Sequence, residues 1–219
     1  MSPVDRRSPL NRDQVVAAAV ALADEDGIAA VSMRKVAGRL GVEAMSLYHH
    51  VANKDDLLDG MVDAVTAEFT VPTDTTDWRA VVRGRCHAAR AALRRHPWAV
   101  GLMDSRSSPG LATLRHHEAV LASLRGAGFS VAGAAHAFAL IDSFLYGFAL
   151  QERNLPFATG DDVAKMAEEL VDHLPPDEFP CMIEMATQHV MVPGYDFGDE
   201  FEPGLELVLD ALERARPTT

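Results

Sequence analysis

A short stretch over residues 44–50 (AMSLYHH) brings together side chains that could read a nucleic acid. If it forms a helix, Leu47 and Val51 share one face and point into the molecule. The opposite face offers an apolar contact for a thymine methyl group and hydrogen-bonding groups for base edges and phosphates. An ordinary solvated helix face would carry Lys and Glu instead. The outward side chains are Met45, Ser46 and His49, with Tyr48 and His50 on the flanks.

Positive charge gathers around this stretch, although the chain as a whole is acidic. The 219 residues carry 20 Lys+Arg and 32 Asp+Glu, a formal net charge of −12. Residues 32–54 hold four basic side chains against the single acidic Glu43, which leaves a net charge of +3. Such an island can contact phosphates while the acidic remainder repels DNA. An ordinary solvated face is the alternative that charge alone leaves open. The four basic residues are Arg34, Lys35, Arg39 and Lys54.

Four short helices are predicted to position these residues. A three-residue turn, 41–43, separates the second helix from a third over 44–50. Two short helices joined by a glycine-containing turn form a helix-turn-helix, whose second helix can enter the DNA major groove. The fourth helix follows directly and ends near residue 69. The residues that indicate these boundaries are the N-caps Asn11, Ser32 and Asn53 and the helix stops Gly27 and Gly41.

The rest of the chain also reads as helix, and no segment alternates as a strand would. The prediction is an all-α protein with an N-terminal helix-turn-helix three-helix bundle over residues 1–69. A larger C-terminal helical domain is predicted over residues 70–219, after the polar linker TVPTDTTD. Its predicted helices are Asp77–His96, Pro97–Met103, Pro109–Gly126, Ser130–Arg153, Asp161–His173, Pro176–Met191 and Asp199–Arg216.

Several protein classes are disfavoured. The longest uncharged stretch, 126–141, has 16 residues and falls short of the roughly 20 that a membrane span needs. The N-terminus has no apolar core of a secretory signal, and two cysteines are too few for a disulfide framework. We therefore expect a cytoplasmic protein with no membrane partner.

Catalytic and metal-binding patterns are also missing from the sequence. It has no HExxH, phosphate-binding loop or nucleophile elbow. His49 and His50 would point about 100° apart on a helix, so a metal pair is disfavoured. We expect no metal, no cofactor and no enzymatic activity. Two alternatives stay open: an enzyme built on the helical bundle, and a DNA-binding protein that needs no effector.

The order of residues adds a family resemblance. The run VSMRKVAGRLGVEAMSLYHHVANKDDLLDGMVDAV, residues 31–65, strongly resembles the DNA-binding domain of TetR-family transcriptional regulators. The shared elements are the Arg-Lys start, Ala-x-x-Leu-Gly-Val, Leu-Tyr-x-His-Val and Asn-Lys-x-x-Leu-Leu. This resemblance covers residues 11–68. A weaker one, which includes the final run VMVPGYDFGDEFEPGLELVLDALER, relates the C-terminal domain to the tetracycline-repressor branch of the family.

The resemblance implies a role for each matched position. Arg34 is expected to read a guanine or a phosphate, and the hydroxyl and basic groups at helix starts are expected to contact phosphates. Where the tetracycline-repressor branch has Gln-Pro-Thr, this chain has residues 44–46 as Ala-Met-Ser, so we expect a different operator. The expected phosphate contacts are Ser32, Tyr48, His50 and Lys54. The expected sequence-reading positions are Glu43, Ala44, Met45, Ser46 and His49.

The resemblance further implies a homodimer that binds a palindromic operator in double-stranded DNA and is released by a small-molecule effector. The interface is expected on the helices Ser130–Arg153 and Asp199–Arg216. Coupling between effector and DNA would run through the fourth helix, from Lys54 to Phe69. The expected lining of the effector pocket is Met61, Val65, Met103, His117, Leu121, Phe138, Asp142, Met166, Leu170 and Met182.

The identity of the effector is constrained in one respect. At the position of the magnesium-binding His of the tetracycline-repressor branch, alignment places Met103 or Asp104, and its Arg-Pro pair becomes Ser108-Pro109. Magnesium–tetracycline is therefore not the expected effector. Asp142 lies within an apolar helix, where its carboxylate could face a cationic effector or bond to a neighbouring group.

Overall fold

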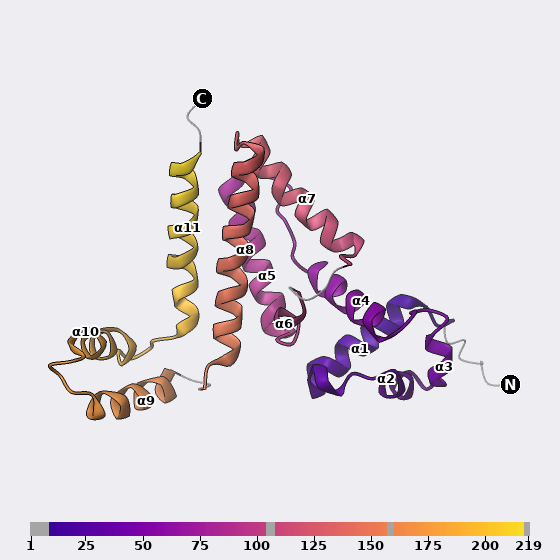
Figure 1. Ribbon diagram of the computed structural model, residues 1–219, viewed down its shortest axis with the longest axis horizontal. Coiled ribbons are helices and arrows are strands. Elements are labelled where there is room, and N and C mark those ends of the chain that lie inside the picture. The colour runs from indigo at the N-terminus through magenta and orange to yellow at the C-terminus, as the bar shows by residue number, and fades with distance from the viewer. Residues whose placement is uncertain (1–8, 104–107, 157–159, 217–219) are drawn as a thin grey trace. The chain divides into compact units, whose positions relative to one another are not determined.

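The computed structural model describes residues 9–103, 108–156 and 160–216. Within these ranges the chain forms helices joined by turns and contains no β-strand, which confirms the all-α prediction (Figure 1). The α-helices are α1 (Arg12–Asp26), α2 (Met33–Leu40), α3 (Ala44–Leu47), α4 (Lys54–Thr66), α5 (Trp78–Arg95), α6 (Val100–Met103), α7 (Leu111–Gly126), α8 (Val131–Asn154), α9 (Gly160–His173), α10 (Pro180–Met185) and α11 (Phe201–Ala215).

The first helices start where a side chain satisfies the free backbone N–H groups of the first turn. The Asn11 side chain accepts from the Gln14 N–H at 2.9 Å, and the Gln14 side chain accepts from the Asn11 N–H at 3.1 Å. This reciprocal pair is a capping box. Ser32 and Asn53 cap α2 and α4 with single bonds of 3.3 and 2.9 Å. The three predicted starts are confirmed.

The turn between α2 and α3 depends on Gly41. Its φ of 70° lies in the left-handed region, which glycine adopts without a steric penalty. The following Val42 N–H bonds to the Ala37 carbonyl at 3.1 Å and closes the end of α2. Leu47 and Val51 are almost fully buried, so the predicted inward face of the third helix is confirmed.

The third helix is shorter than predicted, because α3 ends at Leu47 instead of His50. The bonds that follow are mostly of the three-residue type, such as the one from the His50 N–H to the Leu47 carbonyl at 2.8 Å. The Arg12 guanidinium donates to the His50 carbonyl at 3.2 Å and links this turn to α1.

The largest differences in helix starts are at α10, which begins at Pro180 instead of Pro176, and at α6, which begins at Val100 instead of Pro97. Residues 175–179 form a turn, in which the Phe179 N–H bonds to the Pro175 carbonyl at 3.1 Å, and α10 begins only at Pro180. Proline suits a first helical position because that position needs no N–H donor. A π-helical turn, Ala186–Val190, follows α10, and a 3-10 turn, Phe197–Glu200, precedes α11.

The chain divides into two compact units with the boundary between Ala139 and Leu140, inside α8. In the first unit α1 packs on α4, and α4 packs on α7 and α5. The predicted domain boundary after Phe69 lies within this unit and stays a prediction. The side chains that form the interior of the α1–α4 bundle are Val15, Ala19, Leu22, Leu57, Met61 and Val65.

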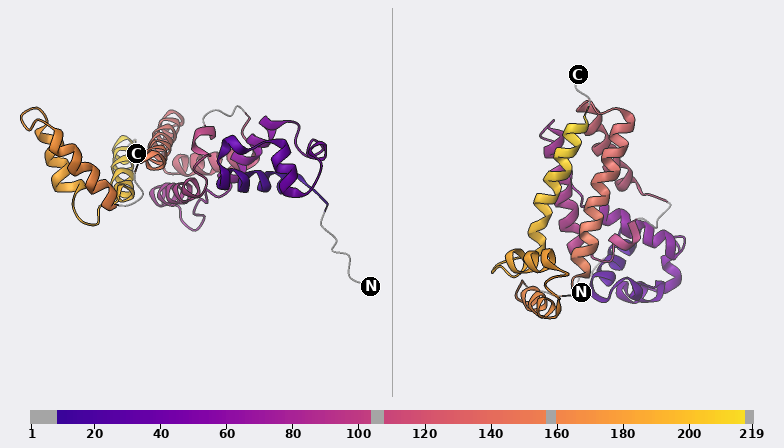
Figure 2. Two further views of the ribbon diagram at one scale, coloured as in Figure 1. Left: turned by 90° about the horizontal axis from the view of Figure 1, so that it is seen from below. Right: turned by 60° about the vertical axis from the view of Figure 1, so that its left-hand side comes forward.

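The second unit, residues 140–216, is organised around the second half of α8 and α11, which run antiparallel (Figure 2). Phe148 stacks on Phe197 at 4.8 Å between ring centroids and meets Phe201 edge-on at 5.0 Å. Leu145 and Leu205 are fully buried in the same unit. The start of α11 is thus held by an aromatic cluster.

The helix α8 is long and apolar enough to cross a membrane by length and composition alone. Core helices of globular proteins pass the same test, so this property does not indicate a membrane protein. Only 28% of its apolar 18-residue window is buried within the chain. Several apolar side chains of this helix therefore remain exposed in a single copy, among them Val131, Leu140 and Leu150.

Candidate nucleic-acid interface

The outward face of α3 and its following turn is exposed and unlike a typical solvated helix face. Met45 is 73% exposed and Tyr48 is 46% exposed, although both are large and partly apolar. Glu43 and His49 are also exposed, whereas Ala44, Ser46 and His50 are half-buried. This exposure leaves the predicted reading positions accessible to a partner. Their contacts with DNA stay a prediction.

The basic residues near this face separate into two kinds. Arg39 makes a two-pronged ion pair with Glu25 at 2.5 and 2.6 Å, and Lys35 lies 3.9 Å from Asp26. These two cations are thus close to acidic groups of α1. Arg34 and Lys54 are exposed, and neither has a hydrogen bond or ion pair to the part of the chain that the structure describes. They are the basic groups most available for a phosphate or a base.

Ser32 has a structural role beside its predicted phosphate contact. Its hydroxyl oxygen accepts from the Lys35 N–H and so caps α2. The hydroxyl hydrogen remains a donor, and a hydroxyl can accept and donate at once. The structure places Ser32 and Lys54 at the start of α2 and α4 respectively, as predicted. Backbone N–H groups at such positions favour an anion.

A clamp formed by Arg12 and Asp56 ties the reading turn to α1 and α4. The Arg12 guanidinium donates to both carboxylate oxygens of Asp56 at 2.6 and 2.9 Å. Asp56 also accepts from the Ala52 N–H at 2.7 Å, and Arg12 reaches the His50 carbonyl. The hydrogen bond from Arg12 lowers the pKa of Asp56, and Asp56 in turn raises the pKa of Arg12. Both groups therefore stay charged at neutral pH.

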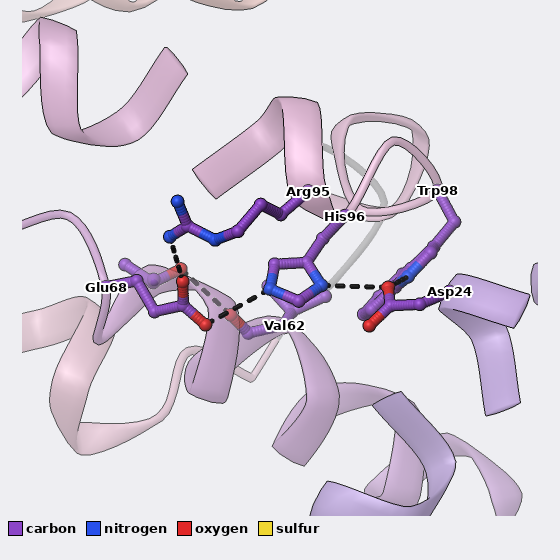
Figure 3. Close-up of polar contacts among 7 residues, drawn as sticks. Asp24, Val62, Glu68, Arg95, His96 and Trp98 are labelled. Atoms are coloured by element: carbon purple, nitrogen blue, oxygen red, sulfur yellow. Dashed lines mark hydrogen bonds and ion pairs between the residues drawn. The ribbon is translucent and has the colours of Figure 1, made fainter. Parts of the chain in front are cut away.

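A second polar cluster joins residues of the N-terminal bundle to the segment that follows α5 (Figure 3). His96, next to the end of α5, lies with Nδ1 2.8 Å from Asp24 of α1 and Nε2 3.1 Å from Glu68 just past α4. The Trp98 indole N–H donates to the same Asp24 oxygen at 2.6 Å, and Arg95 pairs with Glu68. We call Asp24, Glu68, Arg95, His96 and Trp98 the His96 cluster.

The pKa of Glu68 is lowered in this cluster. Burial alone would raise it, but the hydrogen bond from Arg95 and the charge and hydrogen bond of His96 outweigh that effect. Glu68 is therefore ionised at neutral pH. The cluster places two carboxylates, both from the N-terminal bundle, on opposite sides of one imidazole ring (Figure 3).

A third polar contact between segments far apart in the sequence caps α7. Asp63 of α4 accepts from the Thr113 N–H at 2.8 Å, from the Thr113 hydroxyl at 2.9 Å and from the Ala112 N–H at 3.3 Å. Gly110 lies so close that a Cβ at this position would approach the Asp63 carboxylate to 2.2 Å. A side chain of α4 thus satisfies the first turn of α7, where a helix favours negative charge.

The interior of the first unit contains a buried arginine and a buried histidine. Arg85 of α5 is fully buried; its Nε–H donates to His116 Nε2 at 2.9 Å, and its guanidinium lies 5.8 Å from the Phe138 ring centre. His116 Nδ1 lies 3.2 Å from the Phe69 carbonyl. Burial, followed by the charge of Arg85, lowers the pKa of His116 to about 4, so the ring is neutral at neutral pH.

The structure brings together some predicted pocket residues and leaves others apart. Within the first unit, His117 and Phe138 meet edge-on at 5.0 Å, and Leu121 and Met103 are half-buried. Met61 and Val65 are fully buried in the bundle core. Within the second unit Asp142 is half-buried. Three predicted lining residues are between 42% and 48% exposed: Met166, Leu170 and Met182. Asp104 lies outside the described residues.

A groove of about 610 Å³ lies between α1, α4 and the start of α7, and none of the predicted pocket residues lines it. Its polar groups largely bond to one another, as Arg12 does to Asp56 and Asp63 does to α7. The groove is therefore distinct from the predicted effector pocket, because none of the predicted residues lines it. Its charged lining residues are Arg12, Asp13, Asp56, Asp59 and Asp63.

Sequence reasoning missed Arg12, Asp24, Asp63, Glu68 and His96. Their partners lie 27 to 74 residues away in the chain, so no local spacing marks them. One signal was present: Asp55 and Asp56 were expected only to favour the start of the fourth helix, yet an acidic side chain there can also pair with a basic one elsewhere.

Comparison with known proteins agrees with this geometry. Residues 15–61 match the family model described as bacterial regulatory proteins, tetR family, and residues 71–216 match the tetracyclin repressor-like, C-terminal domain. The HTH-type transcriptional repressor DrrR1 of Streptomyces coeruleorubidus is 33% identical over 213 residues, which cover 93% of this chain and 77% of that protein. Tetracycline repressor protein class C of Escherichia coli is 29% identical and covers 96% of this chain, with 94% of its own length matched.

A solved structure supports the same relationship. The TetR family protein ActR of Streptomyces coelicolor, in complex with actinorhodin, superposes with a TM-score of 0.83 at 28% identity. The match covers 96% of this chain and 98% of ActR. The resemblance of residues 31–65 to the TetR family is thus confirmed, together with a C-terminal domain of the tetracycline-repressor type. The chain belongs to the TetR family of bacterial transcriptional regulators.

Proposed function

We propose that the chain is a homodimeric repressor that binds a palindromic operator in double-stranded DNA and is released by a small-molecule effector. The observation that carries this proposal is the helix-turn-helix itself. The turn at Gly41 presents an exposed reading face within the segment matched by the tetR family model. Members of this family are regulators of transcription, so we assign no catalytic activity to the chain.

The dimer is supported by the apolar surface of the second unit. Leu140 and Leu150 of α8 are 44% and 42% exposed, and Leu207 of α11 is 70% exposed. A large exposed apolar surface favours burial against a partner. A two-fold dimer would also place two recognition helices about 34–36 Å apart, which is one turn of DNA.

The relatives support the binding of a small-molecule effector. ActR was solved with actinorhodin bound, and DrrR1 is named a transcriptional repressor. We place the effector in the domain predicted over residues 70–219, with the edge-on pair of His117 and Phe138 as part of its lining. Tetracycline with magnesium, at micromolar concentration, is expected to leave the complex with the operator intact. Release of the operator by this compound would refute the expectation that magnesium–tetracycline is not the effector.

The roles assigned to the reading residues rest on the same surface. Arg34 is to contact a guanine or a phosphate, and Ser32, Tyr48, His50 and Lys54 are to contact phosphates. The sequence-reading positions are Glu43, Ala44, Met45, Ser46 and His49. We further propose a cytoplasmic location, which is typical of soluble regulators of this family.

The test is selection from a random pool of duplex DNA at about 150 mM salt, where non-specific phosphate binding is weakened. An inverted repeat with half-sites about one helical turn apart is expected.

Arg34→Ala should weaken binding to the selected site by about 1–3 kcal/mol. Arg39→Ala is the matched control on the same helix, because Arg39 is already paired with Glu25. Loss of Arg34 without effect on affinity would contradict the role assigned to it.

A further inference from the structure

The His96 cluster contains an unusual arrangement of charge around one ring. Asp24 of α1 faces one nitrogen of His96, and Glu68 past α4 faces the other (Figure 3). The remaining charged group in the cluster is Arg95, which pairs with Glu68 beside the ring. The His96 side chain is only 11% exposed, so water has little access to it. Both carboxylates come from residues 9–69, whereas the histidine follows α5.

The protonation of the ring decides how many of these contacts exist. A neutral imidazole carries one N–H, so it can donate to only one carboxylate. The other ring nitrogen would then hold its lone pair about 3 Å from a carboxylate oxygen, which is a repulsive arrangement. The imidazolium carries two N–H donors and a positive charge, and it can donate to both. Histidine is also the side chain whose charge ordinarily changes between pH 5 and 8.

The position of the ring links it to DNA reading. Asp24 lies on α1, whose Arg12 holds the turn after α3, and Glu68 lies at the end of α4, whose start carries Lys54. A contact that fixes both helices lowers the entropy cost of presenting the reading face in one orientation. Trp98 reports on the contact, because its indole shares the Asp24 oxygen and is only 6% exposed.

We propose that His96 is a positioning residue for DNA binding, and that as an imidazolium it holds α1 and the end of α4 against the segment that follows α5. Deprotonation releases Asp24, because Glu68 is also held by Arg95, and it loosens the reading bundle. Operator affinity therefore falls as the pH rises from 6 to 8. The DNA part of this inference rests on the proposed function, whereas the clamp itself does not.

The first experiment needs no DNA and so tests the clamp alone. The chain has two tryptophans, so in Trp78→Phe the indole fluorescence comes from Trp98 alone. We expect its emission maximum to shift to longer wavelength between pH 6 and 8, because release of Asp24 exposes the indole to water. The shift should be absent when His96→Gln is added. A change in intensity with a constant maximum would mean that the ring titrates without releasing the bundle, and would overturn the proposal.

The second experiment measures affinity for the selected operator at pH 6 and pH 8. We expect about a fivefold loss of affinity on raising the pH, within the range of ordinary coupling energies, and a smaller loss in His96→Gln. His49 and His50 are present in both proteins, so the difference between the profiles belongs to His96. Superimposable profiles, or a loss that is larger in His96→Gln, would overturn the proposal.

Two further variants keep the test independent of misfolding. Glu68→Gln retains the shape of the cluster and the Asp24 contact, and it should show a reduced pH response in both experiments. His87→Gln removes an exposed histidine of α5 and should keep the wild-type profile. If the emission shift appears but no operator is selected, the clamp stands and the proposed function fails. If the operator is bound without any emission shift, the reverse holds.

Discussion

The reading bundle and the segment packed against it are stabilised in different ways. Helices α1, α2 and α4 each start at a cap formed within three residues of sequence, and their core is made by α1 and α4 themselves. The start of α7 and the segment that follows α5 instead depend on distant partners: Asp63 caps α7 across 50 residues, and His96 meets Asp24 across 72. The helices of the reading bundle are thus started by local caps, whereas the contacts that attach the bundle to α7 and to the segment after α5 join residues far apart in the sequence.

The largest expected effect is a loss of stability on mutation of the core of the reading bundle. Leu57 of α4 is fully buried, so Leu57→Ala should lower the free energy of unfolding by about 2–5 kcal/mol. Leu58, its half-buried neighbour, is the control, and Leu58→Ala should cost clearly less. Urea denaturation followed by circular dichroism measures both. Equal losses would mean that α4 does not supply the core in the way described.

The stability of the region packed against the reading bundle should depend on pH through His116 of α7. Burial holds the pKa of His116 at about 4, against 6.5 for an ordinary histidine. Between these values the unfolded chain binds the proton and the folded chain does not, so stability is full above pH 6.5 and is lost as the pH falls toward 4. The loss from this group is at most about 3 kcal/mol.

Unfolding by urea at pH 7 and at pH 4.5 tests this sign. His116→Gln should show a smaller loss between the two conditions than the wild type, because it removes the titrating ring. His173→Gln, at an exposed position of α9, should behave like the wild type. A wild-type protein that becomes more stable on acidification over this range would contradict the assignment.

The reading face itself should discriminate between operators. Residues 44–46 differ from the Gln-Pro-Thr of the tetracycline-repressor branch, and Ala cannot make the paired hydrogen bonds that Gln makes to adenine. We expect the operator of that branch to bind at least about tenfold more weakly than the selected operator, since one mismatch costs about 1–3 kcal/mol. Competition binding with both duplexes at the same salt concentration decides it. Equal affinity would show that these three positions do not set the sequence preference.

The smallest expected effect concerns a single cap. The Asn53 side chain accepts from the Asp56 N–H at 2.9 Å, and Asn53→Ala should lower stability by about 1 kcal/mol. Asn53→Asp keeps an accepting oxygen and should retain most of it. Thermal unfolding of the three proteins gives the comparison. An Asp variant as unstable as the Ala variant would argue that the cap bond is not the source of the loss.

The contrast between the two regions also explains what could be predicted from the sequence. The caps at Asn11, Ser32 and Asn53, the turn at Gly41 and the inward side chains of the third helix follow from rules that act within a few residues. The contact of Arg12 with the His50 carbonyl could not be predicted, because it joins residues 38 apart in the sequence. The start of α10 at Pro180 was missed for a simpler reason: Pro175-Pro176 offered a competing signal nearby.

The candidate site was predictable to the same extent. The exposed reading face followed from helical periodicity together with the family resemblance, and Arg34 and Lys54 are open to solvent as expected. The His96 cluster and the Arg85–His116 pair could not be inferred, because a lone histidine or arginine in a helical pattern does not identify its partner. The effector pocket was the least determined, since methionine and aromatic side chains occur equally in any helical core.

The cap that Asp63 supplies to α7 has a consequence for engineering chimaeric regulators. Exchange of residues 9–69 for the segment of a relative that lacks Asp24, Asp63 and Glu68 would remove the carboxylate that caps α7 and both carboxylates that contact His96. A chimaera whose DNA-binding bundle lacks these three acidic residues would keep the operator preference of its donor. Its helix α7, however, would lack the cap that Asp63 supplies. Chimaeras that keep Asp24, Asp63 and Glu68 together with the new reading face should respond to the effector, because these three side chains contact His96 and the start of α7.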